Sequence, residues 1–279
     1  MKLGCGTVLF RQYDLQRALG AIREIGYEYF ETQAVGPWCP HVDVYKDDPV
    51  KLTELKNKFG FKGITGLWSL DGNIISNPKA VESGIRSIEF ASEAGIPVLH
   101  TGDGHKPEGM TDEYAFKVFE EKMLKILEVA KKKGVKVAIE PHGSFSLTKD
   151  GLLKILSIST SDVLGVNYDA CNIFRAGYVE SGLGKSGYKS TGTNGNEVEV
   201  LTAVSDRVYH MHAKDINASG DCVAIGEGLV DVKNCVKHLK NINYNGVISL
   251  ETEGNNTFEE AVDLAKKSYI TLSKYINEQ

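Results

Sequence analysis

Residues Val208 to Ile216 have the sequence VYHMHAKDI, in which two classes of side chain alternate. Successive side chains of a β-strand point to opposite faces, so Tyr209 and Met211 would share one face and His210 and His212 the other. The first face is bulky and apolar, as packing beneath a layer of helices requires, whereas the second is polar and titratable. The pattern predicts a strand of a helix-covered sheet whose other face carries chemistry.

Three further runs repeat this division between a bulky apolar face and a small or polar one. They are VKVAIE (135–140), GVNYD (165–169) and VISLE (247–251). In each run the polar face ends in an acid, and these acids are Glu140, Asp169 and Glu251. Ionisable groups at the ends of successive strands indicate an active site at the carboxyl edge of a parallel sheet.

Strand-like runs occur eight times in all and alternate with amphipathic helical patterns; the other four are KLGCGTV (2–8), EYFETQ (28–33), FKGITGLWS (61–69) and PVLHTG (97–102). Repeated βα units of roughly 30 residues make a parallel sheet covered by helices, and eight of them favour a closed barrel. No G-x-G-x-x-G opens a helix after a strand, which argues against a dinucleotide-binding open sheet. We predict an α/β fold, a single (β/α)8 TIM-barrel domain over residues 1–279.

Helix starts are predicted where a capping residue precedes an apolar periodicity. Asp14 is a candidate N-cap, Asn77 followed by Pro78 suggests a second helix start, and Thr257 with Glu260 fits a capping box. The segment 115–130 has one continuous apolar face and predicts a long helix.

Composition and charge narrow the class of partner. A net charge of -5 and a pI near 5.9 provide no attraction for polyanions, so neither nucleic acid nor an anionic membrane is expected as a partner. The five cysteines show no C-x-x-C spacing, and no run has the length of a signal or membrane segment. We therefore expect free thiols, a cytoplasmic location and a small-molecule substrate.

One segment interrupts the alternation. Residues 176–196, AGYVESGLGKSGYKSTGTNGN, are rich in glycine and too long for an ordinary connection after the sixth strand. The segment is either a flexible insertion or a lid that orders over substrate.

The four ionisable strand ends suggest a metal site. Inward carboxylates are costly to bury unless a cation compensates them, and Glu140, Asp169, His212 and Glu251 would meet at the mouth of a barrel. Three carboxylates with one imidazole suit Mn²⁺ or Mg²⁺, although Co²⁺, Fe²⁺ or Zn²⁺ could also bind. His210 lies one layer deeper and is interpreted as a core residue or as one that orients its neighbours.

Four motifs resemble those of the sugar phosphate isomerase/epimerase superfamily, the xylose isomerase-like TIM barrels. In chain order they are AIEPHG, GVNYDACN, HMHAKD and SLETEG. The AIGEGLVD segment resembles the G-x-G stretch of the same family, and the resemblance covers nearly the whole chain. It implies that the four residues hold one divalent metal, often manganese, and that the protein acts on a carbohydrate. It also implies that a homo-oligomer is an option.

The resemblance implies a mechanism as well. In this superfamily the two glutamates, here Glu140 and Glu251, flank a carbon next to a carbonyl and exchange its proton. The metal acts as a Lewis acid that stabilises the enediolate. Return of the proton to the opposite face gives an epimerase, return to the neighbouring carbon gives an isomerase, and loss of a β-hydroxyl gives a dehydratase.

Candidate substrate-binding residues lie around these ligands. They are His142 and Lys214, two residues beyond a ligand; Trp68 and His100, late in the third and fourth strands; and Asn172. Lys214 could instead pair with a nearby acid, and Trp68 and His100 could instead pack in the core. Ketose 3-epimerases of the superfamily carry a histidine and an arginine where this chain has Asn172 and Ala218. This difference argues against a free-ketohexose 3-epimerase, unless the nearby Arg175 compensates.

We therefore predict a metal-dependent isomerase or epimerase of a sugar, keto-sugar, sugar acid or sugar phosphate. The alternative is a lyase of the same superfamily, either an inosose- or dehydroshikimate-type dehydratase or an oxo-sugar-acid decarboxylase. Two other functions are less well supported by the sequence. DNA repair of the endonuclease IV type would need more histidine ligands and a basic face. A binding module without catalytic activity would not need all four metal-ligand residues.

Overall fold

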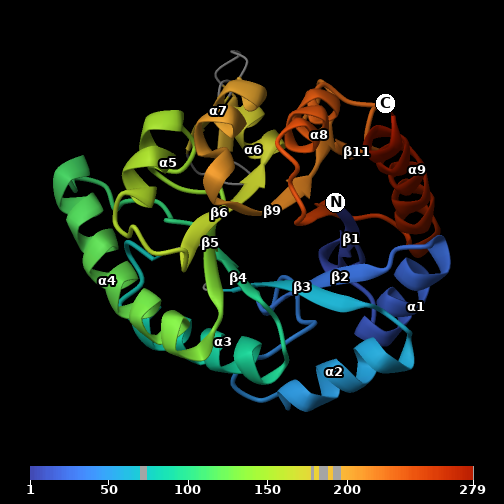
Figure 1. Ribbon diagram of the computed structural model, residues 1–279, viewed down its shortest axis with the longest axis horizontal. Helices are drawn as coiled ribbons and strands as arrows, with labels where there is room; N and C mark the ends of the chain where they lie inside the picture. The colour runs from blue at the N-terminus through green and yellow to red at the C-terminus, as the bar shows by residue number, and fades with distance from the viewer. Residues whose placement is uncertain (70–73, 177–178, 182–187, 191–195, 279) are drawn as a thin grey trace.

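The computed structural model is a closed barrel of parallel strands surrounded by helices (Figure 1). It describes residues 1–69, 74–176, 179–181, 188–190 and 196–278. The barrel strands follow the order β1-β12-β9-β6-β5-β4-β3-β2, and β2 pairs with β1 to close the ring. Their bounds are β1 Lys2–Gly6, β2 Tyr29–Gln33, β3 Gly63–Trp68, β4 Val98–Thr101, β5 Lys136–Ile139, β6 Leu164–Asp169, β9 Val208–Ala213 and β12 Val247–Leu250. All eight predicted strands and the (β/α)8 fold are confirmed.

Helices follow the strands and form the outer layer. Their bounds are α1 Leu15–Ile25, α2 Pro49–Lys58, α3 Ala80–Glu93, α4 Asp112–Lys133, α5 Lys149–Leu156, α6 Ala170–Ala176, α7 Glu197–Val204, α8 Val232–Asn241 and α9 Phe258–Asn277, with short 3-10 helices at Thr7–Phe10 and Ser205–Arg207. Within the described part of the chain, no helix is long and apolar enough to cross a membrane.

Two of the three predicted helix starts have the expected caps. The Asp14 side chain accepts hydrogen bonds from the first turn of α1, and Thr257 with Glu260 forms a capping box at α9. The helix start predicted at Asn77 and Pro78 was too early, because α3 begins at Ala80 with Lys79 at its N-cap. Asn77 does accept a hydrogen bond from the backbone N–H of Lys79, so it closes a turn that precedes the helix.

The hydrophobic core fills the space between barrel and helices, as the alternation predicts. The outward residues of the four motif strands are buried there, among them Val137, Tyr168, Met211 and Leu250. A buried apolar side of this kind fixes the register of each strand, because a slip of one residue would turn it inward. The polar residues of the same strands therefore have to face the barrel axis.

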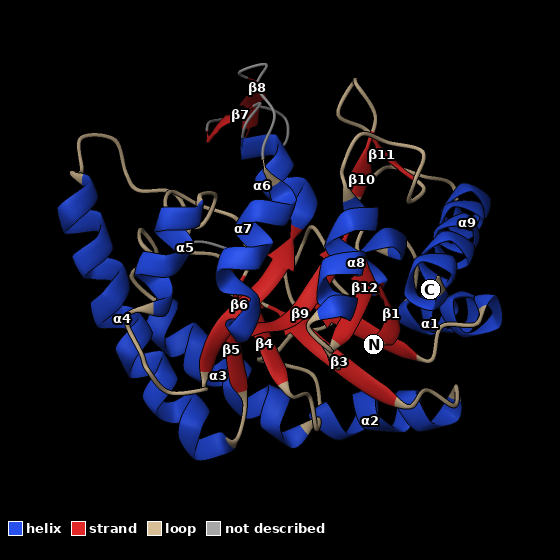
Figure 2. Ribbon diagram, turned by 45° about the horizontal axis from the view of Figure 1, so that its top comes forward, coloured by secondary structure: helices blue, strands red, loops and turns tan. Residues whose placement is uncertain are grey.

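Short elements lie beyond the carboxyl ends of the barrel strands (Figure 2). The hairpin β10 Asp215–Ile216 with β11 Cys222–Val223 follows β9, and β7 Val179–Ser181 pairs with β8 Tyr188–Ser190. The buried Asp215 carboxylate accepts from the backbone N–H groups of Gly226, Gly228 and Val230, so it anchors the AIGEGLVD loop. The glycine-rich segment 176–196 contains β7 and β8, but most of it lies outside the described residues, and so does the predicted lid.

Candidate metal centre

The carboxyl ends of four neighbouring strands carry the predicted ligands. Asp169 ends β6 and pairs in register with His212 of β9. Glu140 and Glu251 each come one residue after a strand, but their backbone N–H groups still bond to Thr101 and Ala213, at 2.8 Å and 3.0 Å. The extended pairing continues the alternation by one residue, which directs both glutamates into the barrel.

Glu140, Asp169, His212 and Glu251 converge on one point. Each offers a ligand atom, these four atoms all lie within 4.8 Å of one another, and every one of the side chains is buried. The Nδ1 atom of His212 faces the two glutamates, 3.2 Å from Glu140 Oε2 and 3.4 Å from Glu251 Oε2. The arrangement can hold a single cation with three oxygen ligands and one nitrogen ligand.

Hydrogen bonds hold the Glu140 carboxylate in place. Trp68 Nε1 donates to Oε2 at 2.7 Å, Asn167 Nδ2 lies 3.2 Å from the same atom, and Asn172 Nδ2 donates to Oε1 at 3.0 Å. On the opposite side, Gln33 Nε2 donates to Glu251 Oε1 at 3.1 Å. These donors stabilise the ionised carboxylates and restrict their rotamers, as the outer contacts of a metal site do.

Two carboxylate oxygens provide the test of whether a metal fits. Asp169 Oδ2 and Glu251 Oε2 are buried and lack a hydrogen-bond partner within the described ranges. Lys214 Nζ lies 3.0 Å and 2.5 Å from them, close enough for ion pairs but poorly aligned for hydrogen bonds. Their remaining lone pairs suit a divalent ion, and the oxygen-rich donor set fits Mn²⁺ or Mg²⁺ without excluding Zn²⁺.

The charges of the site strongly shift the pKa values of its side chains. Burial alone would lower the pKa of His212, but Glu251, Glu31 and Glu140 outweigh it and raise that pKa well above its usual value. Burial alone would raise the pKa of Glu251, but His212 and Lys214 hold it well below the usual range. A metal that binds Nδ1 of His212 therefore competes with a proton for that atom.

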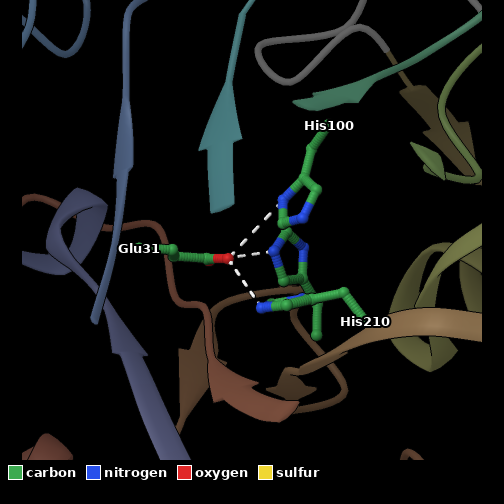
Figure 3. Close-up of side chains that lie close together, drawn as sticks. Glu31, His100 and His210 are labelled. Atoms are coloured by element: carbon green, nitrogen blue, oxygen red, sulfur yellow. Dashed lines mark ion pairs between the residues drawn. The ribbon is translucent and has the colours of Figure 1, made fainter. Parts of the chain in front are cut away.

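A second group of buried polar side chains lies next to this centre. Glu31 Oε1 is 2.9 Å from His212 Nε2, while Glu31 Oε2 is 3.4 Å from His210 Nε2 and 3.6 Å from His100 Nδ1. Figure 3 shows the Glu31 carboxylate pointing at the His100 and His210 rings. Burial lowers the pKa of both these histidines well below its usual value. The Glu31 contact leaves Nδ1 of His212 to face the predicted ligands.

A pocket of about 700 Å³ opens above the centre. Glu140 and Glu251 lie in its wall, together with Trp68, His142, Arg11 and Arg175. A lining that combines polar groups, cationic groups and indole rings can bind a hydroxylated or anionic small molecule.

The predicted substrate-binding residues lie at different depths. Trp68 and His142 line the pocket. Lys214 is 1% exposed and makes ion pairs with metal-ligand candidates, the alternative that the sequence left open. The Asn172 side chain donates to Glu140, and its backbone N–H donates to Asp169. His100 lies deeper, beside Glu31.

Sequence reasoning did not single out Glu31, Gln33 or Asn167. The first two lie two residues apart in EYFETQ, on the face opposite Phe30, and Asn167 precedes Asp169 by two. The alternation in GVNYD places Asn167 on the inward face with Asp169, and the same alternation applied to EYFETQ would have placed Glu31 and Gln33 inside the barrel. Arg11 follows a short 3-10 helix after β1, where no periodic pattern indicates a direction.

Comparisons with known proteins agree with the barrel fold. Residues 19–269 match a family model described as a xylose isomerase-like TIM barrel. An uncharacterised protein of Methanocaldococcus jannaschii is 25% identical, across 99% of this chain and 89% of its own length. An inosose dehydratase of Clostridium beijerinckii is 24% identical, across 68% of this chain and 67% of its own length.

Solved structures share the fold over the whole chain. A D-tagatose 3-epimerase-like protein superposes with a TM-score of 0.79 at 23% identity, across 100% of this chain and 99% of the other. The IOLI protein with a bound zinc atom superposes with a TM-score of 0.77 at 18% identity, across 100% of both chains. At such identities the likeness establishes the architecture alone.

Proposed function

The chain belongs to the xylose isomerase-like TIM barrel family, and on that premise we propose that it is a divalent-metal-dependent isomerase or epimerase. Its substrate is a sugar, keto-sugar, sugar acid or sugar phosphate. The observation that carries the proposal is the meeting of Glu140, Asp169, His212 and Glu251 at the base of a pocket, with both glutamates in the pocket wall.

The four residues would hold the metal, and Mn²⁺ fits their oxygen-rich donor set best. A bound divalent ion would supply Lewis acidity to the carbonyl and neighbouring hydroxyl oxygens of the substrate. The zinc in the IOLI structure belongs to a protein of the same fold, so zinc is the second candidate.

The two glutamates move the proton. Glu140 and Glu251 reach the pocket from strand ends that β6 and β9 separate in the barrel order, so they approach a bound substrate from different sides. One carboxylate takes the proton from the carbon next to the carbonyl, and the other returns it to the opposite face or to the neighbouring carbon. The hydrogen bonds from Trp68 and Gln33 keep each carboxylate oriented during the transfer.

The second candidate is a lyase of the same family. The similarity to an inosose dehydratase, over about two thirds of the chain, favours it. The first step is the same proton removal, and the reaction then ends with loss of a β-hydroxyl as water, to which a protonated glutamate would donate.

Hydrogen exchange in D₂O separates these reactions. Metal-loaded protein is incubated with a panel of ketoses, sugar acids, sugar phosphates and inososes, and the products are followed by NMR and mass spectrometry. An isomerase or epimerase incorporates deuterium next to the carbonyl and keeps every oxygen, whereas a lyase yields a product lighter by one water.

The variants Glu140→Gln and Glu251→Gln should each abolish conversion of substrate into product, because an amide can neither accept the proton nor return it. Glu128→Gln is the matched control, since Glu128 is exposed and pairs only with its helix neighbour Lys132 among the described contacts. Conversion of substrate into product that persists in both active-site variants would refute the assignment of the two glutamates.

A further inference from the structure

Glu31, His100 and His210 form a polar cluster inside the barrel, below the residues that line the pocket. They come from β2, β4 and β9 and are 2%, 0% and 0% exposed. The proposed function uses none of them. Full burial of a carboxylate against two imidazoles is costly unless each lone pair has a partner.

The hydrogen atoms of this cluster can be assigned from its neighbours. Asn167 Nδ2 lies 3.2 Å from Glu140 Oε2, where only a donor fits, so Asn167 Oδ1 faces His210 Nδ1 at 3.0 Å. His210 therefore carries a hydrogen on Nδ1, and its Nε2 atom faces the cluster. Thr65 lies 3.3 Å from Nε2, but its hydroxyl donates to the carbonyl of Phe30.

The lone pairs of the cluster consequently face one another. Glu31 Oε2 lies 3.4 Å from the lone pair of His210 Nε2 and 3.6 Å from His100 Nδ1. Neither oxygen of Glu31 and neither ring nitrogen of His100 has a well-aligned hydrogen bond to any residue that the structure describes. Such facing acceptors suit a shared cation, and one ligand atom from each of the three residues lies within 4.8 Å of the others and of His212.

We propose that Glu31, His100 and His210 bind a second divalent transition-metal ion, beneath the first centre. Metal–ligand bonds of about 2.0–2.1 Å in tetrahedral geometry place neighbouring ligand atoms roughly 3.3 Å apart, close to the two separations observed. Two imidazoles with one carboxylate favour Zn²⁺, Fe²⁺ or Co²⁺ over Mg²⁺, in contrast to the oxygen-rich centre above.

Gly66 of β3 makes room for this arrangement. A Cβ atom at this position would lie 2.2 Å from the Cε1 atom and 2.9 Å from the Nδ1 atom of His100. A side chain at position 66 would therefore push the His100 ring out of its place. The His100 ring can occupy its position only because residue 66 has no side chain. A substitution at this position would therefore disturb the site without removing a ligand.

The cluster lies next to a hollow at the other end of the barrel. Thr65 and His210 are among the residues that line a hollow at the amino ends of the strands, with Lys2, Tyr29 and Val247. His210 therefore borders this hollow as well as the cluster.

The test is a metal count on the full-length protein. Metal-free protein is dialysed against Co²⁺ or Zn²⁺, and bound ions per chain are measured by mass spectrometry, with the visible spectrum of Co²⁺ reporting low-coordinate sites. We expect two ions in the wild type, one in His100→Phe, and one in the double variant Glu140→Gln, Asp169→Asn. Glu128→Gln, the exposed control, should bind two.

Gly66→Ala keeps all three ligands and provides a second measurement if His100→Phe does not fold. It should lower the binding affinity of the lower ion by about 10–100-fold and leave the affinity of the upper ion unchanged. A single ion in the wild type that disappears in the Glu140 and Asp169 double variant would overturn the proposal. Two ions that survive both His100→Phe and Gly66→Ala would do the same.

The same measurements distinguish failure of the lower site from failure of the proposed function, which depends on the upper centre. A wild-type protein that holds one ion, keeps it in the double variant and loses it in His100→Phe supports the lower site and contradicts the upper centre.

Discussion

Replacing Lys214 with methionine should destabilise the metal-free protein strongly. The Lys214 ammonium is buried and lies 3.0 Å from Asp169 Oδ2 and 2.5 Å from Glu251 Oε2. Methionine has a similar volume, so the change removes the charge and leaves the packing largely intact. Two buried carboxylates then lose their closest ammonium.

The expected loss is about 3–5 kcal/mol of unfolding free energy, the usual effect of removing one partner of a buried ion pair. For a chain of this length that corresponds to a fall in melting temperature of roughly 6–20 °C. A divalent ion at the neighbouring ligands should replace much of the missing positive charge, so saturating metal should narrow the difference between variant and wild type.

The assay is thermal and urea unfolding with EDTA and again with saturating Mn²⁺. Lys149→Met is the matched control, because its ion pair with Glu199 is exposed and its loss should leave the melting temperature nearly unchanged. Two results would refute the reasoning: a Lys214→Met variant that melts with the wild type in EDTA, or a difference that metal does not reduce.

Three further predictions concern the same end of the barrel. Trp68→Phe removes the 2.7 Å hydrogen bond to Glu140 and should weaken metal binding about 10–100-fold by calorimetry, whereas unchanged affinity would contradict an orienting role. Because the pKa of His212 is raised well above its usual value, metal affinity should rise with pH up to that pKa. Binding at neutral pH should release about one proton, and equal heats in buffers of different ionisation enthalpy would disprove this. Asp215→Asn leaves backbone N–H groups of the AIGEGLVD loop unpaired, and each unpaired group costs about 1–3 kcal/mol of stability. Amide hydrogen exchange at Gly226, Gly228 and Val230 should therefore become faster. Unchanged exchange rates would argue against an anchoring role for Asp215.

Local patterns were sufficient for much of the fold. The capping box at Thr257 and the N-cap at Asp14 involve contacts within one turn, so the residues that make them are close in the sequence. The start of α3 was placed early because Asn77 bonds to a turn before the helix, and a turn and a helix cap use the same side-chain chemistry.

The candidate site was partly predictable for the same reason. Strand alternation alone directed Glu140, Asp169, His212 and Glu251 inward. It could not decide between substrate and ion pair for Lys214, because that choice depends on how near Asp169 and Glu251 lie once the barrel closes.

The sequence by itself determined the eight strands, the inward direction of four ionisable residues and the family, because a period of two residues is a local property of the chain. Only the tertiary structure decided that Asn172 holds Glu140 and that Glu31, His100 and His210 face one another. These residues belong to elements that are far apart along the chain. Ring closure brings them together across the barrel axis, and no local pattern encodes a distance across a barrel.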